Sequence, residues 1–125
     1  VTLGGTTLVA HLTAGHTRGC TTWTMKAQEG GKTLNVVFAC SYRSPAPVTP
    51  EIEKEFNRTF DLIRSLPCDV PLGDHPAQYS MAAKYAKLKA NAPNPFIDSA
   101  NCWVEAEIQE AMLRAQLKMQ QAAKP

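Results

Sequence analysis

The most informative stretch of this chain is Gly15-His16-Thr17-Arg18-Gly19-Cys20-Thr21-Thr22-Trp23-Thr24. A histidine stands between two glycines, shortly after the apolar run at residues 8–12. Glycine permits positive φ and therefore tight turns. The pattern places the His16 imidazole just beyond a strand, where metal and catalytic sites are common. A plain turn that carries a histidine fits the same residues.

Length and composition limit the class of protein. A chain of 125 residues is one domain or a piece of one. The 44% hydrophobic content is enough for a core, and no stretch is long and apolar enough to span a membrane. The net charge of +2, with no basic stripe, points to neither nucleic acid nor a membrane as partner. The start at Val1 lacks a signal-peptide pattern, so we expect a processed chain or a fragment.

Periodicity and turn residues predict the order of the elements. Two short strands flank Gly4-Gly5 within residues 1–12, and residues 20–26 and 33–40 form a hairpin. A loop at 41–50 leads into a helix that Thr49 caps and Pro67 ends. A short strand at 68–72 and helices at 79–91 and from Ser99 to about residue 121 follow. The residues expected to be buried on the three helices are Ile52, Phe56, Phe60, Ile63 and Leu66; Tyr79, Ala82, Ala83, Ala86 and Leu88; and Trp103, Val104, Ile108, Met112, Ala115 and Met119.

The order of elements favours an α/β fold with a mixed sheet and helices on one face. The second face of such a sheet needs a partner. One half of a larger sandwich would leave that face uncovered. His11 lies within a predicted strand, and nothing around it in the sequence suggests a ligand cluster.

Four cysteines, an even number, allow three pairings. The absence of a C-x-x-C pair argues against a structural zinc ribbon, so disulfides in a periplasmic or secreted protein are expected. Cys20 lies ten residues before Gly30, the approximate centre of the predicted hairpin, and Cys40 lies ten residues after it. Facing residues of an antiparallel hairpin have Cβ atoms about 5 Å apart. This spacing predicts a Cys20–Cys40 disulfide, provided that no bulge shifts the register.

Two motifs carry a resemblance to a known family. Residues 11–24, His-Leu-Thr-Ala-Gly-His-Thr-Arg-Gly-Cys-Thr-Thr-Trp-Thr, resemble the third zinc-ligand motif of the metallo-β-lactamase superfamily. The form Gly-His-Thr-x-Gly-Ser/Cys-Thr is typical of its third β-lactamase subclass, zinc enzymes with His and Asp ligands and no Cys ligand. Ser-Leu-Pro-Cys-Asp at 65–69, followed by His75, resembles the last ligand motif of that subclass, and Asn-Pro-Phe-Ile-Asp at 94–98 fits the same region. The match covers nearly all of residues 1–121 and resembles the C-terminal half of such an enzyme.

The resemblance implies that residues 1–125 are the C-terminal half of one αβ/βα sandwich domain, with the N-terminal half absent. It implies zinc-dependent hydrolysis of the amide bond of β-lactam antibiotics, and hence antibiotic resistance. The complete enzyme would hold two zinc ions, with His16 as a ligand of the first and His75 as a ligand of the second. Zinc lowers the pKa of a bound water to about 7, which suits hydrolysis at neutral pH.

The same resemblance implies further roles. Ser41 corresponds to a serine that helps to bind the substrate carboxylate, in place of a metal ligand of related subclasses. Arg43 stands where relatives often carry a second serine, and it is either a partner of that carboxylate or a solvated charge. Cys68 and Cys102 match the structural disulfide of the family. Cys40 neighbours the position of a ligating cysteine in another subclass, so a metal-ligand role is the alternative to a disulfide there.

One motif of the family is absent. The signature His-x-His-x-Asp-His does not occur, and the only histidines are residues 11, 16 and 75. A catalytic zinc has three protein ligands, so we expect the missing half to supply the others and the isolated chain to be inactive. Two alternatives stay open. One is another hydrolase of the same fold, a lactonase or thioesterase, although those relatives usually carry a bridging Asp near position 40. The other is a non-catalytic module held by disulfides.

Overall fold

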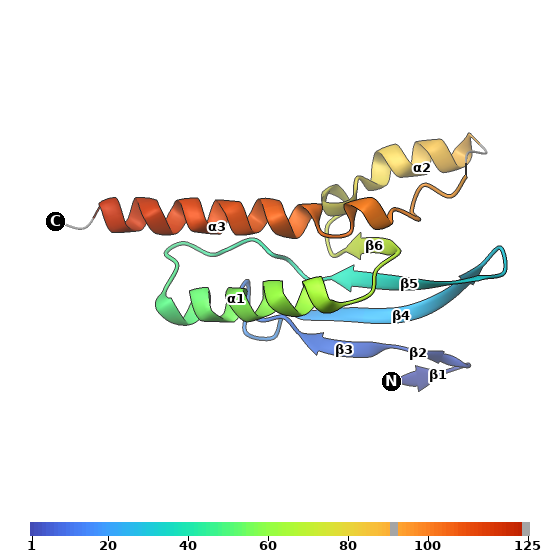
Figure 1. The fold of residues 1–125 in the computed structure, drawn as a ribbon, viewed down its shortest axis with the longest axis horizontal. Helices are drawn as coiled ribbons and strands as arrows, with labels where there is room; N and C mark the ends of the chain where they lie inside the picture. The colour runs from blue at the N-terminus through green and yellow to red at the C-terminus, as the bar shows by residue number, and fades with distance from the viewer. Residues whose placement is uncertain (91–92, 124–125) are drawn as a thin grey trace.

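The structure, a computed structural model, describes residues 1–90 and 93–123. Its centre is a four-stranded sheet in the order β3-β4-β5-β6 (Figure 1). Neighbouring strands are antiparallel except β5 and β6, which are parallel. The strands are β1 (Thr2–Leu3), β2 (Thr6–Thr7), β3 (Val9–Leu12), β4 (Thr21–Glu29), β5 (Lys32–Ala39) and β6 (Val70–Gly73). The helices are α1 (Pro50–Ser65), α2 (Met81–Lys89) and α3 (Val104–Ala122), with short 3₁₀ turns η1 (Pro76–Tyr79) and η2 (Ser99–Asn101).

The predicted α/β fold with a mixed sheet is confirmed. The two strands predicted around Gly4-Gly5 are present, but the second of them is divided into β2 and β3: β2 pairs with β1 in a separate two-stranded ribbon, and β3 joins the main sheet. None of the helices in the described ranges is long and apolar enough to cross a bilayer.

Helix α1 follows its predicted pattern closely. The side chain of Thr49 accepts a hydrogen bond from the backbone N–H of Ile52, and Pro50 occupies the first turn. Acidic residues in that turn suit the positive end of the helix dipole. The helix ends at Ser65, two residues before Pro67, and its most deeply buried apolar side chains are Phe56, Phe60 and Ile63.

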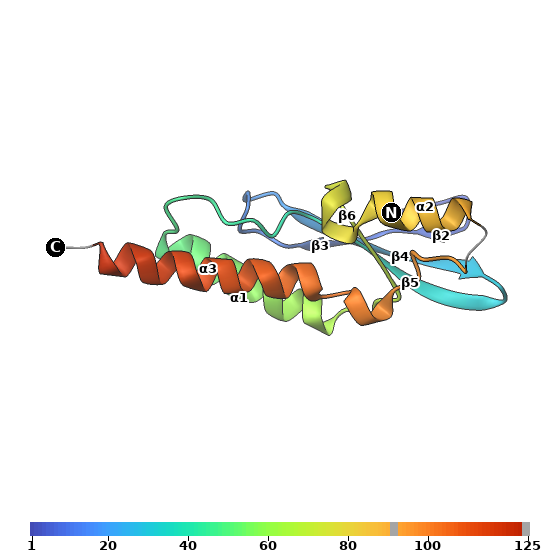
Figure 2. The ribbon, with the colours of Figure 1, turned by 90° about the horizontal axis from the view of Figure 1, so that it is seen from above.

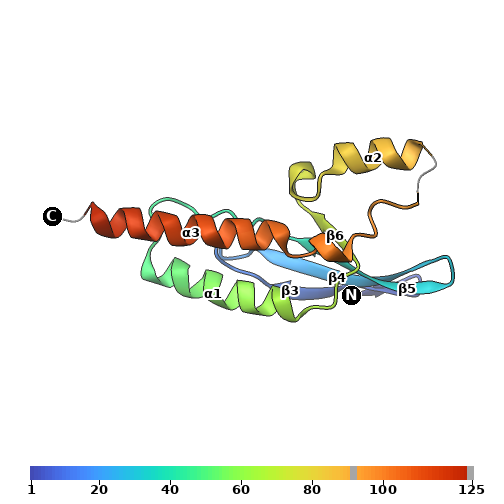
Figure 3. The same ribbon diagram turned by 45° about the horizontal axis from the view of Figure 1, so that its top comes forward.

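The core lies between α1, α3 and the loop that follows β5. Its buried members are Phe56, Phe60 and Ile63 of α1, Ala106 and Leu113 of α3, and Tyr42 and Val48 of the loop. Figure 2 shows α1 and α3 on the same side of the sheet, which agrees with the prediction of helices on one face. Helix α2 stands apart from this pair, as Figure 3 shows.

The predicted inward face of α2 is wrong. The predicted helix is divided at Ser80 into η1 and α2, and α2 buries no residue. Tyr79 is half-buried in η1, whereas Ala82, Ala83, Ala86 and Leu88 are exposed. Periodicity shows which residues share a face, but it does not show whether another element covers that face. The predicted end of this helix at Asn91 lies outside the described residues.

The predicted buried face of α3 is also wrong. The stripe of Val104, Ile108, Met112 and Met119 is exposed, from 41% for Val104 to 73% for Met119, and Ala115 is exposed too. The face toward α1 instead carries Ala106 and Leu113, while Trp103 is half-buried. Helix α3 therefore has two apolar faces, and the longer one has no cover among the described residues. Ser99 begins η2 rather than capping α3, whose N-cap position is Trp103.

The Cys20–Cys40 disulfide is present, although the predicted register is offset. The turn consists of Gly30 and Gly31, both at positive φ, and pairing runs from Glu29↔Lys32 to Trp23↔Phe38. The centre therefore lies between the two glycines, and Cys20 and Cys40 are not at symmetric positions. Both cysteines lie beyond the last residue pair of this ladder, and their Cα atoms are 5.8 Å apart. A disulfide also joins Cys68 to Cys102, with Cα atoms 6.1 Å apart.

The second face of the sheet is open only in part: Leu34 and Val36, which share a face of β5 with Phe38, are buried. Ala39 packs on the helical core, and because side chains alternate along a strand, Phe38 points to the opposite face. Phe38 is 39% exposed. It lines an apolar hollow with Trp23, Leu8 and Val1.

Candidate metal site

Strand directions place the predicted site residues at one edge of the sheet. Strands β3, β5 and β6 all run the same way, because β4 is antiparallel to its two neighbours and β6 is parallel to β5 (Figure 1). Their carboxyl ends therefore lie at the same edge. His16 follows β3, Ser41 and Arg43 follow β5, and His75 follows β6.

The loop that carries His16 is fixed to α1. Gly15 has a φ of +146°, and a Cβ at this position would lie 2.9 Å from ring atoms of Phe56. Only glycine permits this close contact at this backbone angle. Thr59 Oγ1 of α1 donates a hydrogen bond of 2.7 Å to the backbone carbonyl of Ala14. The backbone beside His16 is thus held while its imidazole remains exposed.

A single hydrogen bond orients the His16 ring. Its Nδ1 lies 2.7 Å from the backbone carbonyl oxygen of Arg43. A carbonyl only accepts, so Nδ1 carries the hydrogen and donates it. In the neutral ring this leaves the lone pair on Nε2. Metal-binding histidines typically donate their second ring N–H to a carbonyl or carboxylate in this manner.

His75 lies two residues beyond β6. The backbone N–H of Asp74 donates to Ala39 O at 3.2 Å, which ties this turn to the end of β5. The backbone N–H of His75 donates to Gln78 Oε1 at 3.4 Å. The His75 side chain is exposed. Convergence of the His16 and His75 ring nitrogens on a shared two-metal site stays a prediction.

The described part of the chain contains no group of three or more His, Cys, Asp or Glu side chains arranged to hold a metal ion. His11 lies within the sheet, with Nε2 at 2.9 Å from Thr24 Oγ1. The sulfur of Cys40 is in a disulfide and so does not act as a thiolate ligand in this structure. His16 and His75 remain the two histidines at the sheet edge.

The loop after β5 carries the two predicted substrate contacts. Ser41 is half-buried, and its Oγ lies 3.4 Å from the backbone N of Arg43, whose side chain is exposed. Between them Tyr42 is buried in the core, and burial raises the pKa of its hydroxyl above the usual range, so this group stays protonated at neutral pH. The contact between the Arg43 carbonyl and His16 has no signal in the sequence, because every residue carries a backbone carbonyl.

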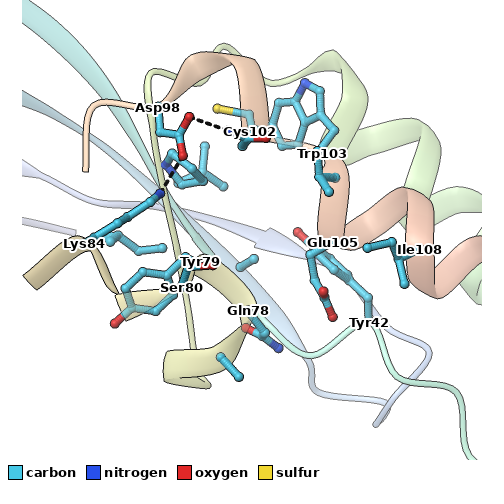
Figure 4. Close-up of a pocket in the computed structure, with 17 residues that line it drawn as sticks. Tyr42, Gln78, Tyr79, Ser80, Lys84, Asp98, Cys102, Trp103, Glu105 and Ile108 are labelled. Carbon is cyan, nitrogen blue, oxygen red and sulfur yellow. Dashed lines mark hydrogen bonds and ion pairs between the residues drawn. The ribbon is translucent and has the colours of Figure 1, made fainter. Parts of the chain in front are cut away.

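A cavity of about 380 Å³ lies beyond His75, between η1 and the start of α3. Figure 4 shows Gln78 and Ser80 on one side and Trp103, Glu105 and Ile108 on the other. Lys84 of α2 reaches across one end of the cavity to Asp98. The sequence contains no motif that indicates this cavity.

The described residues form a layered α/β fold that carries two histidines at one edge of its main sheet. No family model matches it. Among solved structures, it is similar to native FEZ-1 metallo-β-lactamase from Legionella gormanii, with 36% identity and a TM-score of 0.91 over 97% of this chain and 49% of that chain. It is also similar to BJP-1, a subclass B3 metallo-β-lactamase of Bradyrhizobium japonicum, with 39% identity and a TM-score of 0.88 over 98% of this chain and 49% of that chain.

The metallo-β-lactamase SMB-1, in a complex with mercaptoacetic acid, matches at 28% identity and a TM-score of 0.87 over 96% of this chain and 49% of that chain. The chain therefore spans about half the length of the metallo-β-lactamases that it matches. It resembles subclass B3 enzymes and has their α/β fold over that part. The resemblance predicted from the sequence motifs is confirmed.

Proposed function

We propose that residues 1–125 are the C-terminal half of a single metallo-β-lactamase domain, and that the complete enzyme hydrolyses the amide bond of β-lactam antibiotics. His16 is a ligand of one zinc ion and His75 a ligand of a second. The observation that carries this proposal is the hydrogen bond from His16 Nδ1 to the Arg43 carbonyl at 2.7 Å. It fixes the ring and leaves Nε2 for a metal.

The donor set fits zinc, for which neutral imidazole nitrogen is a good ligand. When bound, zinc acts as a Lewis acid and lowers the pKa of water to about 7. The chain itself would hold and orient the ligands. Gly15 and Thr59 fix the His16 loop on α1, and the Asp74–Ala39 hydrogen bond fixes the turn before His75 on β5.

Ser41 and Arg43 are the proposed substrate contacts. Both follow β5 at the same edge as the histidines, and the Arg43 side chain is exposed. A guanidinium binds a carboxylate through two parallel hydrogen bonds. We therefore assign Arg43, with Ser41, to the carboxylate of the β-lactam.

The remaining zinc ligands would come from the missing N-terminal half, since two histidines do not complete a catalytic zinc site. The sheet face around Phe38 and the stripe of α3 are exposed apolar surfaces. The N-terminal half would cover them when the two halves associate. Both disulfides support an exported location, the periplasm or the cell exterior, where antibiotic resistance would be exerted.

The disulfide at Cys40 favours β-lactam hydrolysis over the lactonase or thioesterase alternative. Those relatives usually carry a bridging carboxylate near this position, whereas Cys40 is bonded to Cys20. The identities of 36% and 39% to metallo-β-lactamases likewise favour an enzyme over a non-catalytic module.

An assay of the isolated chain and of the complete protein tests this function. With a chromogenic cephalosporin, we expect no measurable turnover by residues 1–125 alone, because each zinc would have one ligand. Co-expression with the N-terminal half should give turnover that a chelator abolishes, with slower or absent hydrolysis of a lactone and a thioester. Chelator-sensitive turnover by the isolated chain would contradict the half-site proposal, and a preference for the lactone or thioester would contradict the substrate class.

A further inference from the structure

The segment from His75 to Lys89 contains no fully buried residue. Helix α2 buries no residue, and Ser80, with a φ of +55°, joins it to η1. The cavity of about 380 Å³ separates η1 from α3 on one side. The Tyr79 ring meets Phe96 at a centroid distance of 6.3 Å, which is one contact to the segment before α3. Another interaction is therefore needed to fix α2.

The pair Lys84–Asp98 supplies that interaction. Lys84 Nζ lies 2.7 Å from Asp98 Oδ2, and the two side chains are only 11% and 19% exposed (Figure 4). Every residue of α2 is exposed except Lys84, which is half-buried. A shielded ion pair is screened by salt much less than a surface pair.

Asp98 is itself held in a fixed place. Its backbone N–H donates to Asp69 O at 2.8 Å, and Asn101 Nδ2 donates to its Oδ1 at 2.6 Å. The disulfide Cys68–Cys102 joins the two segments beside these contacts. The hydrogen bond from Lys84 lowers the pKa of Asp98, so this carboxylate is charged at neutral pH. Asp98 is therefore tied to the segments of Asp69 and Asn101, and its ion pair with Lys84 joins α2 to them.

We infer that Lys84 is a positioning residue for His75: its ion pair with Asp98 holds α2 and η1, and thereby the turn that presents the His75 imidazole to the second zinc. The inference rests on the proposed function for the role of His75. It assigns Lys84 no contact with zinc or substrate. The ion pair acts on the metal site only through the backbone of residues 75–80.

The test compares Lys84→Met, Lys84→Arg and the control Lys89→Met in the full-length protein. Lys89 lies on the same helix, with Nζ 4.8 Å from the centre of the Tyr85 ring. Lys84→Met should weaken one of two zinc sites by about 10–100-fold in chelator competition, the range for residues that orient a ligand. It should also speed amide hydrogen exchange at residues 75–80 in the zinc-free protein. Lys84→Arg should keep most of the zinc affinity and most of the protection from exchange at residues 75–80. Lys89→Met should change neither the zinc affinity nor the exchange.

Unchanged zinc affinity and exchange in Lys84→Met, or an equal effect of Lys89→Met, would overturn the inference. So would weakening of both zinc sites together, because that indicates general destabilisation. If the unmodified protein binds no zinc, the proposed function fails. Hydrogen exchange at residues 75–80 then still decides whether Lys84 fixes this turn.

Discussion

Replacing His16 with alanine is expected to lower β-lactam turnover by the complete enzyme by more than about 100-fold, because loss of a ligand should exceed the 10–100-fold cost of losing a residue that orients one. The ring is already oriented by Arg43 O, with Nε2 left for the metal. Its removal would take away a proposed ligand of the first zinc ion. Turnover of a chromogenic cephalosporin and bound zinc per protein should fall together.

Two other histidines serve as comparison and control. His75→Ala should lower turnover steeply as well, with loss of zinc from the second site. His11→Ala should leave turnover nearly unchanged, because His11 is engaged with Thr24 within the sheet. Full activity of His16→Ala, or a loss in His11→Ala as large as in His16→Ala, would contradict the ligand assignment.

Removing the Cys68–Cys102 disulfide should cost about 4 kcal/mol of unfolding free energy, the chain-entropy value for a loop of this size. The bond closes a sequence separation of 34 residues and ties the start of β6 to the start of α3. In a domain of twice this length the loss corresponds to a fall in Tm of roughly 10 °C. The double variant Cys68→Ala/Cys102→Ala, measured by thermal unfolding of the full-length protein, gives this value directly.

The matched control removes the other disulfide through Cys20→Ala/Cys40→Ala. Its sequence separation of 20 residues predicts a slightly smaller loss, about 3 kcal/mol. A non-reduced digest of the unmodified protein should contain both linked peptides. A free, alkylatable Cys40 together with an intact Cys68–Cys102 bridge would refute the Cys20–Cys40 disulfide.

Local signals in the sequence were sufficient for the strands around Gly30 and for α1. A Gly-Gly turn between apolar runs specifies a hairpin, and Thr49-Pro50 with the acidic first turn specifies a helix start. The buried side chains of α1 were correct because the helix packs on α3 and the loop after β5. The motif around His16 was equally informative, since Gly15 is required by its φ and by Phe56.

Faces of helices were harder to predict than their positions. On α3, Val104 and Ile108 form part of the longest apolar stripe, but the chain covers Ala106 and Leu113 instead. Which stripe is buried depends on neighbours that are distant in sequence or absent from this chain. The same limit applies at the site, because its contacts join residues that are not neighbours in the sequence. His16 forms a hydrogen bond with the backbone carbonyl of Arg43, and Lys84 of α2 forms an ion pair with Asp98, which precedes η2.

In the proposed function, this chain gives one ligand to each of two zinc ions. Anomalous diffraction at the zinc edge, from crystals of the complete protein, would locate both ions and identify their ligands. We expect two zinc ions about 3.5–4 Å apart, with His16 Nε2 about 2.0–2.1 Å from one and a His75 ring nitrogen at the same distance from the other. Both histidines on a single ion, or a zinc ion bound without either of them, would contradict this expectation.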